Sequence, residues 1–124
     1  YQYSDRWADP GKQILPVAWE GITQEQMLDS VFQYTKSTML AFRAAGVYPD
    51  MVQVGNEICN GMLWPNGKLP GNWDGFAQLL QAGINGVYAS CGNNPCPKIL
   101  AMVSVSETTR VTSFPTGEVL KIAS

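Results

Sequence analysis

The sequence contains no histidine and carries little net charge, and both shortages exclude classes of function. Without histidine, these residues cannot form a Ser-His triad, a Cys-His dyad or a histidine-based metal site. The chain has 8 Lys and Arg residues against 10 Asp and Glu, which gives a net charge of −2. No basic surface is therefore expected for nucleic acid or an anionic membrane. A neutral polysaccharide or a small polar ligand fits this charge balance better.

Cysteine is also scarce, with 3 residues in the chain. Cys91 and Cys96 flank a Gly-Asn-Asn-Pro loop that a disulfide could close, and two reduced thiols are the alternative. A disulfide would favour a secreted protein. Cys59 would then be unpaired and act as a small apolar packing residue. The cysteine spacing and the lack of histidine argue against zinc, so we predict no metal and no cofactor.

Neither a long apolar run nor a signal peptide is visible in these residues. No run approaches the roughly 20 apolar residues of a membrane helix. The first residues, Tyr1 to Ser4, include no initiator Met, and we interpret them as a mature terminus or the start of a partial sequence. The hydrophobic content of 45% is ordinary for a single globular domain or part of one.

Hydrophobic periodicity predicts two helices that alternate with two strands. Thr23 to Gln26 has the form of a capping box, and apolar residues at helical spacing follow it until Gly46. These signals predict a helix over about residues 24–45. The remaining predictions are a second amphipathic helix and two buried strands, over about 73–89, 51–55 and 99–105.

The predicted loops are long after strands and short after helices. The long loops are residues 1–22 and 60–72, which are rich in Trp, Pro and Gly. In a βα barrel the loops after the strands build the active site. Two or three βα units cannot close a barrel of about 250 residues. We therefore predict an α/β fold that forms part of a (β/α)8 barrel.

The segment Val54-Gly55-Asn56-Glu57 places two polar residues directly after a predicted buried strand. This position should partly shield the Glu57 carboxyl from water and favour its neutral form, which can protonate a leaving oxygen. The Asn56 amide can hydrogen-bond a sugar hydroxyl. The structural alternative is a Glu57 carboxylate that accepts hydrogen bonds from backbone amides at the strand end.

Trp7 and Trp64 lie in the two predicted strand-end loops. Exposed indoles can stack on the apolar faces of sugar rings and donate a hydrogen bond from the ring N–H. For each tryptophan alone, packing within its loop is the alternative. Together with a strand-end Glu57, the two tryptophans favour a carbohydrate site.

Two long motifs resemble the arabinogalactan endo-β-1,4-galactanases. Tyr3-Ser-Asp-Arg-Trp-Ala-Asp-Pro-Gly-Lys-Gln13 is similar to the loop after their third strand, and residues 49–65 are similar to their fourth strand and its loop. The similarity runs over roughly residues 1–102. Two positions depart from the family, which usually has His in place of Gln2 and Thr in place of Arg6. Gln2 can donate a hydrogen bond but cannot carry a proton.

The resemblance implies a barrel of the large clan of retaining glycosidases. It implies a secreted, monomeric enzyme that cleaves β-1,4-galactan side chains of pectin, with no nucleic-acid or membrane partner. Glu57 would be the general acid/base, and Asn56 would contact the sugar hydroxyl beside the reacting carbon. The full set of predicted substrate-binding residues is Asn56, Trp7, Asp5, Trp64 and Gln2.

The resemblance also implies that the nucleophile is a second Glu, at the end of the seventh strand and outside this chain. Residues 1–124 would then be a fragment of one catalytic domain, from the end of the third strand through about the fifth, and inactive alone. After residue 100, the acidic residues that could be considered as a nucleophile within the chain are Glu107 and Glu118. For both, the alternative is a surface carboxylate without a catalytic role. Two other functions stay open. One is a non-catalytic galactan-binding or structural fragment; the other is a glycosidase of the same clan acting on mannan or xylan.

Overall fold

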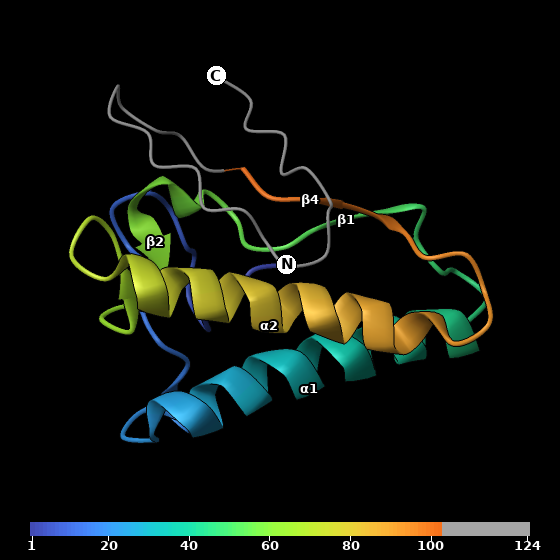
Figure 1. Cartoon of the computed structure of the whole chain (residues 1–124), viewed down its shortest axis with the longest axis horizontal. Helices are drawn as coiled ribbons and strands as arrows, with labels where there is room; N and C mark the ends of the chain where they lie inside the picture. Colours follow the sequence, from blue (N-terminus) through green and yellow to red (C-terminus); the bar gives the residue numbers. More distant parts are fainter. Residues whose placement is uncertain (103–124) are drawn as a thin grey trace.

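The computed structural model describes residues 1–102, which form two long helices beside a pair of short strands. Helix α1 spans Gln24–Ala44 and helix α2 spans Trp73–Cys91. Strand β1 spans Met51–Gln53 and strand β4 spans Lys98–Leu100. In Figure 1 the two helices run side by side in the same direction, and α2 lies between α1 and the strands. The two helices therefore alternate with β1 and β4 along the chain, as the sequence predicts.

Helix α1 begins and ends at strong local signals. The Thr23 hydroxyl accepts a hydrogen bond from the Gln26 backbone N–H at 3.2 Å, and the Gln26 side chain accepts one from the Thr23 N–H at 2.9 Å. At the other end, Gly46 adopts φ 75° and the Val47 N–H donates to the Phe42 carbonyl at 3.0 Å. These contacts are a capping box and a Schellman-type stop. Both predicted helix ends are confirmed.

The two strands are parallel neighbours, with Met51 opposite Lys98 and Gln53 opposite Leu100. The pairing continues for one bond, because the Val54 N–H donates to the Leu100 carbonyl at 2.9 Å. Strand β1 is shorter than predicted, since Gly55 turns away at φ 79°. Residues 103–105 of the second predicted strand lie outside the described residues, as do Glu107 and Glu118.

A small hairpin occupies the segment that the sequence predicts as a plain loop. Strands β2 (Gly61–Met62) and β3 (Gly67–Lys68) pair antiparallel just after a 3-10 turn, η2, at Ile58–Asn60. A side chain at Gly61 would collide with the Gly67 carbonyl oxygen. The plain-loop prediction was therefore wrong here, because a pair this short and glycine-rich shows no alternating pattern.

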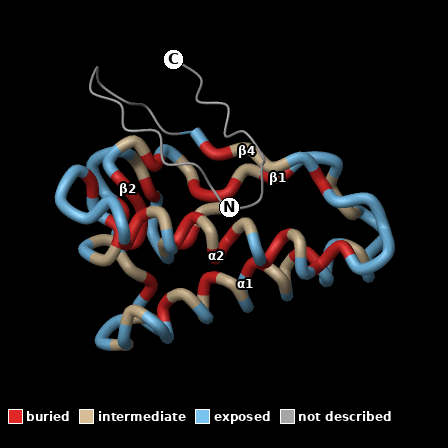
Figure 2. The backbone as a smooth tube through the Cα atoms, in the orientation of Figure 1, coloured by how far each residue is buried: buried red, intermediate tan, exposed pale blue. Residues whose placement is uncertain are grey.

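The core lies between α2 and the elements on either side of it, as the buried segments in Figure 2 show. Helix α1 turns one buried stripe inward, made of Met27, Val31, Thr35 and Met39. The helices approach closely at Gly86, where an added Cβ would lie 2.7 Å from the Phe32 carbonyl oxygen and 2.8 Å from the Thr35 Cβ. On its strand side, α2 brings Gly83 against Val54 and the Tyr3 hydroxyl.

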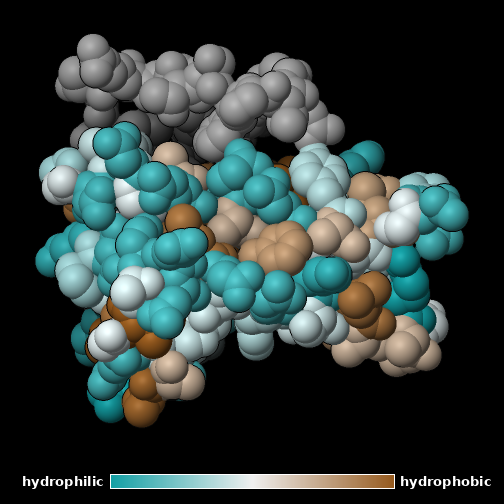
Figure 3. Space-filling model, turned by 60° about the horizontal axis from the view of Figure 1, so that its bottom comes forward, coloured by the Kyte–Doolittle hydropathy of each residue, from teal (hydrophilic) through white to brown (hydrophobic). Residues whose placement is uncertain are grey.

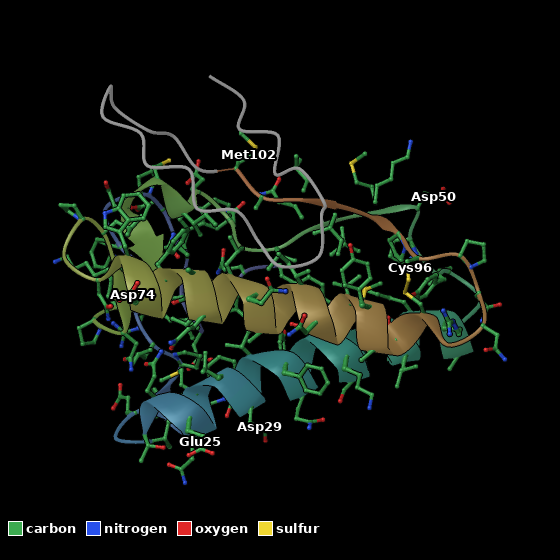
Figure 4. All side chains as sticks on the ribbon, in the orientation of Figure 1. Glu25, Asp29, Asp50, Asp74, Cys96 and Met102 are labelled. Atoms are coloured by element: carbon green, nitrogen blue, oxygen red, sulfur yellow. A yellow bond between two sulfur atoms is a disulfide. The ribbon has the colours of Figure 1, made fainter. Side chains whose placement is uncertain are left out.

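A disulfide joins Cys91 and Cys96, so the structure decides between the two alternatives left open by the sequence. Their Cα atoms are 5.2 Å apart, and Figure 4 shows the bond at the end of α2. Cys59 is free and half-buried.

The face of the described residues that Figure 3 shows is mainly hydrophilic. In Figure 3 the hydrophobic residues on the visible face form separate spots within hydrophilic surroundings. Within residues 1–102, neither helix combines the length and apolar character needed to cross a membrane.

Candidate active site

Glu57 lies in a sharp turn directly after β1. Its backbone adopts φ 50° and ψ 44°, in the left-handed region, and it caps the 3-10 turn η2. A residue with a Cβ pays about 1–2 kcal/mol for this conformation. The conformation persists only where the surroundings hold it, and such residues concentrate at functional sites. This strain supports a functional role for Glu57 over that of an ordinary strand-end residue.

The turn is held by Gln13, to which the sequence assigned no role. The side chain of Gln13 is 5% exposed. Its amide nitrogen donates to the carbonyl oxygens of Asn56 at 3.0 Å, Glu57 at 3.3 Å and Asp9 at 3.2 Å. One buried amide therefore joins the loop before α1 to the turn after β1. No local pattern could reveal this, because the partners are more than forty positions apart.

The Glu57 side chain is exposed, which corrects the predicted partial shielding. The prediction rested on burial of the strand, and Val54 is indeed 0% exposed. The left-handed turn, however, carries Glu57 beyond the buried end of β1. Any cover over its carboxyl would have to come from outside residues 1–102.

Asn56 and the loop carrying Trp7 are neighbours. The half-buried Asn56 side chain donates a hydrogen bond to the Ala8 carbonyl at 3.4 Å. Trp7, one residue earlier, is 78% exposed. The fold thus brings two predicted substrate-binding residues to the same end of β1 and leaves the Trp7 ring accessible to a sugar.

Asp5 and Gln2 shape the same loop. The Asp5 carboxylate accepts a hydrogen bond from the Val17 N–H at 2.7 Å, at the start of a 3-10 turn, η1 (Val17–Trp19). The Gln2 side chain donates to the Arg6 carbonyl at 2.6 Å. Both side chains therefore hold the backbone on either side of Trp7, and their predicted contact with sugar stays a prediction.

Trp64 is anchored to its own hairpin. Its indole N–H donates to the Asn60 carbonyl at 2.9 Å, and the Lys68 ammonium lies 4.5 Å from the ring centre. Its backbone N–H donates to the Gln13 carbonyl at 2.7 Å. These contacts favour the packing alternative for Trp64, because its N–H is already used and a cation covers one ring face.

The other polar features of residues 1–102 offer less for catalysis or for binding a metal. A shallow depression of about 610 Å³ adjoins the start of α1 and includes Glu25 and Asp29 in its lining. Figure 4 shows both side chains pointing outward from α1, away from α2 and β1. Within residues 1–102, no three His, Cys, Asp or Glu side chains gather closely enough to hold a metal ion.

Barrel enzymes carry their catalytic residues at the carboxyl ends of the strands, where Glu57 lies, and the exposed Trp7 ring in the neighbouring loop offers a face for a sugar, so the site fits the class of enzymes that cleave glycosidic bonds. Known proteins narrow this class. The chain belongs to glycosyl hydrolase family 53, whose family model matches residues 1–116. The family resemblance predicted from the two motifs is therefore confirmed, and the match reaches beyond residue 102.

Two curated relatives are similar to the chain over most of its length. The chain is 41% identical over 100 residues to an arabinogalactan endo-beta-1,4-galactanase of Humicola insolens, covering 81% of this chain and 29% of that protein. It is 41% identical over 88 residues to a probable arabinogalactan endo-beta-1,4-galactanase A of Aspergillus flavus, covering 71% of this chain and 25% of that protein. The chain thus spans about a quarter of the length of these relatives.

Two solved structures have the same arrangement of elements. The GH53 catalytic domain of Ignisphaera aggregans superposes with a TM-score of 0.75 at 39% identity, over 82% of this chain and 27% of that domain. A fungal beta-1,4-galactanase superposes with a TM-score of 0.76 at 40% identity, over 82% of this chain and 30% of that one. The α/β character of the fold prediction is confirmed by these neighbours.

Proposed function

We propose that this chain is a segment of an endo-β-1,4-galactanase that hydrolyses galactan side chains of pectin with retention. The observation that carries the proposal is the position of Glu57, in a strained turn at the carboxyl end of β1. The substrate class is supported by the 41% identity to a named galactanase. Both relatives described above are named as galactanases, which favours galactan over the alternative clan substrates, mannan and xylan.

Glu57 would act first as an acid and then as a base. In the first step it protonates the glycosidic oxygen while that oxygen leaves the sugar. In the second step its carboxylate takes a proton from the water that hydrolyses the glycosyl-enzyme intermediate. The retaining mechanism needs a second carboxylate about 5–5.5 Å away. We place this nucleophile outside the chain, at the end of the seventh strand.

The chain would supply one arc of a (β/α)8 barrel. Strands β1 and β4 would be the fourth and fifth barrel strands, and α1 and α2 the third and fourth helices. The parallel pairing of β1 with β4 and the alternating order support this assignment. So does the chain's coverage of 27–30% of two solved catalytic domains.

Substrate would bind over the exposed end of β1. Trp7, 78% exposed, offers the ring face of a sugar subsite, and Asn56 offers an amide beside the reacting carbon. Asp5 and Gln2 would contribute at the rim of the same loop. Trp64 has the weakest support among the predicted binding residues, because its N–H and one ring face are engaged.

The disulfide between Cys91 and Cys96 supports secretion, because such bonds persist in oxidising compartments. An extracellular polysaccharide would be the partner, and the intact enzyme would act as a monomer without a cofactor.

The full-length protein with this segment should release reducing ends from β-1,4-galactan and little from mannan or xylan. Glu57→Gln should lower kcat/KM on galactan by at least about 10²-fold, because general acid–base catalysis contributes about 10²–10⁴-fold. Glu25→Gln, an exposed change in the first turn of α1, is the matched control and should leave kcat/KM unchanged.

Two outcomes would contradict the proposal. Faster turnover of mannan or xylan than of galactan would assign another substrate. Galactan binding in affinity electrophoresis, with no reducing ends released, would point to a non-catalytic binding protein.

A further inference from the structure

The contacts of Gln13 require a side chain that donates hydrogen bonds to several backbone carbonyl groups. An amide NH2 group has two donor hydrogens and no acceptor. Here it faces three carbonyl oxygens, those of Asp9, Asn56 and Glu57, at 3.2, 3.0 and 3.3 Å. A carboxylate of the same shape would bring acceptor atoms against acceptors. The site therefore requires a donor, and the side chain that supplies it is 5% exposed.

The two carbonyl groups contacted in the turn lie on either side of the Glu57 Cα. The Asn56 carbonyl belongs to the peptide plane before Glu57, whose orientation sets φ of Glu57. The Glu57 carbonyl belongs to the plane after it, whose orientation sets ψ. By binding both oxygens, one amide fixes the two torsions that place Glu57 in the left-handed region.

Gln13 is itself held in place from two directions. Its backbone carbonyl accepts a hydrogen bond from the Trp64 N–H at 2.7 Å, and Ile14 forms an isolated parallel bridge with Trp64. Nearby, the Asn60 side chain donates to the Pro10 carbonyl at 2.8 Å. The loop before α1 and the segment after β1 are therefore clamped together around the Gln13 amide.

We propose that Gln13 is a positioning residue that fixes the backbone of Glu57 and so aims its carboxyl at the glycosidic oxygen. This inference rests on the proposed function for its chemical consequence. Gln13 does not touch the substrate in this account. Its effect passes through the two peptide planes that flank Glu57.

A positioning role predicts a loss that depends on the leaving group. When galactan is cleaved, the leaving sugar departs as an alcohol, and its oxygen needs a proton from the acid. The aryl group of a 2,4-dinitrophenyl β-galactobioside leaves as a stable phenolate anion, so its departure needs no proton from the acid. A displaced acid should therefore slow cleavage of galactan far more than cleavage of the aryl substrate. A general weakening of the fold would lower both rates equally.

The test uses two variants of the full-length protein. Gln13→Glu keeps the shape and leaves no donor as a carboxylate or one donor as a carboxylic acid, and Gln13→Met removes all hydrogen bonding. For each we expect kcat/KM on galactan to fall about 10- to 100-fold, since a misplacement of 1 Å can cost on the order of 10²-fold. On the aryl substrate we expect a change below about 3-fold. Gln33→Met, the same substitution on the exposed face of α1, should change neither value.

The outcomes separate the two proposals. Two results would overturn the positioning role and leave the proposed function standing. One is an equal fall of kcat/KM on both substrates in the Gln13 variants. The other is an unchanged kcat/KM on galactan in these variants when Glu57→Gln lowers it. If the wild-type protein cleaves no galactan, the proposed function fails.

A crystal structure of the full-length Gln13→Met or Gln13→Glu protein tests the positioning role without any activity. We expect Glu57 to leave the left-handed region in either variant. A positive φ at Glu57, with both flanking carbonyl groups unmoved, would overturn the inference. Two variants are used so that, if one fails to fold, the other still tests the positioning role.

Discussion

At the scale of single residues, the two site tryptophans differ in what their rings already touch. Trp7 is 78% exposed, whereas Trp64 donates its N–H to Asn60 and has the Lys68 ammonium over its ring. We therefore expect Trp7→Ala to raise KM for galactan about 2- to 10-fold, the loss of roughly 0.5–1.5 kcal/mol of ring contact, without lowering the melting temperature. Steady-state kinetics and thermal unfolding of the full-length protein measure both.

Trp64→Ala is the matched comparison and should show the reverse pattern. It should lower the melting temperature, because it removes a hydrogen bond and the contact with Lys68. It should change KM for galactan less than Trp7→Ala does. If Trp64→Ala raised KM more than Trp7→Ala, the predicted sugar subsite would lie over the hairpin and not over the loop of Trp7.

Tyr3 links the site loop to the helices through a buried hydroxyl. The Thr35 hydroxyl donates to the Val31 carbonyl at 2.8 Å, so the Tyr3 O–H donates to the Thr35 oxygen, also at 2.8 Å. Burial raises the pKa of the Tyr3 phenol above its ordinary value of 10. The folded protein therefore keeps this proton more tightly than the unfolded chain. The resulting stability is complete below about pH 10 and is lost as the pH rises through the folded pKa.

Tyr3→Phe should cost about 1 kcal/mol of unfolding free energy at pH 7, the net value of one hydrogen bond. The difference in unfolding free energy between wild type and variant should narrow above about pH 10. The wild type loses stability there as Tyr3 titrates, and the variant has no such group. Urea unfolding of the full-length proteins at pH 7 and pH 11 measures the gap. A gap that widens at pH 11 would show that burial of Tyr3 does not oppose its ionisation.

At the scale of elements, the contact between α1 and α2 depends on a missing side chain at Gly86. An added Cβ would meet the Phe32 carbonyl oxygen and the Thr35 Cβ, both below 3 Å. Gly86→Ala should lower the unfolding free energy by about 1–3 kcal/mol, because overpacking outweighs the gain of about 1 kcal/mol in helix propensity. Chemical denaturation of the full-length protein gives the value.

Asn85→Ala is the control for Gly86→Ala. Asn85 is exposed on α2, and its side chain accepts a hydrogen bond from Gln81 in the neighbouring turn at 2.9 Å. Its replacement should change stability by less than about 0.5 kcal/mol. A stabilised Gly86→Ala protein would mean that α1 and α2 can move apart at no cost, contrary to their close approach at Gly86.

The elements also show why some predictions succeeded. Helix α1 was predicted at both ends because its signals are local: Thr23 and Gln26 cap each other, and Gly46 supplies a positive φ. The hairpin of β2 and β3 escaped prediction because its pairing depends on a turn that brings Gly61 beside Gly67. Such contacts leave no periodic pattern in the sequence.

At the scale of the whole molecule, the chain should be unable to complete the proposed reaction. Retaining hydrolysis needs two carboxylates about 5–5.5 Å apart, and we place the second outside these residues. The isolated chain should therefore release no reducing ends from galactan under conditions where the full-length protein does. Retaining turnover by the isolated chain, abolished by Glu57→Gln, would overturn this prediction and require a nucleophile within residues 1–124.

Local motifs were enough to predict the family, the order of the main helices and strands, and the identity of the candidate acid. The exposure and backbone conformation of Glu57, in contrast, depend on contacts between loops that are distant in the sequence. The tertiary structure showed the carboxyl exposed, the backbone left-handed and the turn held by Gln13. It also joined Cys91 to Cys96. The physical reason is that a hydrogen bond between residues 13 and 57 arises from the folding of two distant loops together, and neither loop encodes it alone.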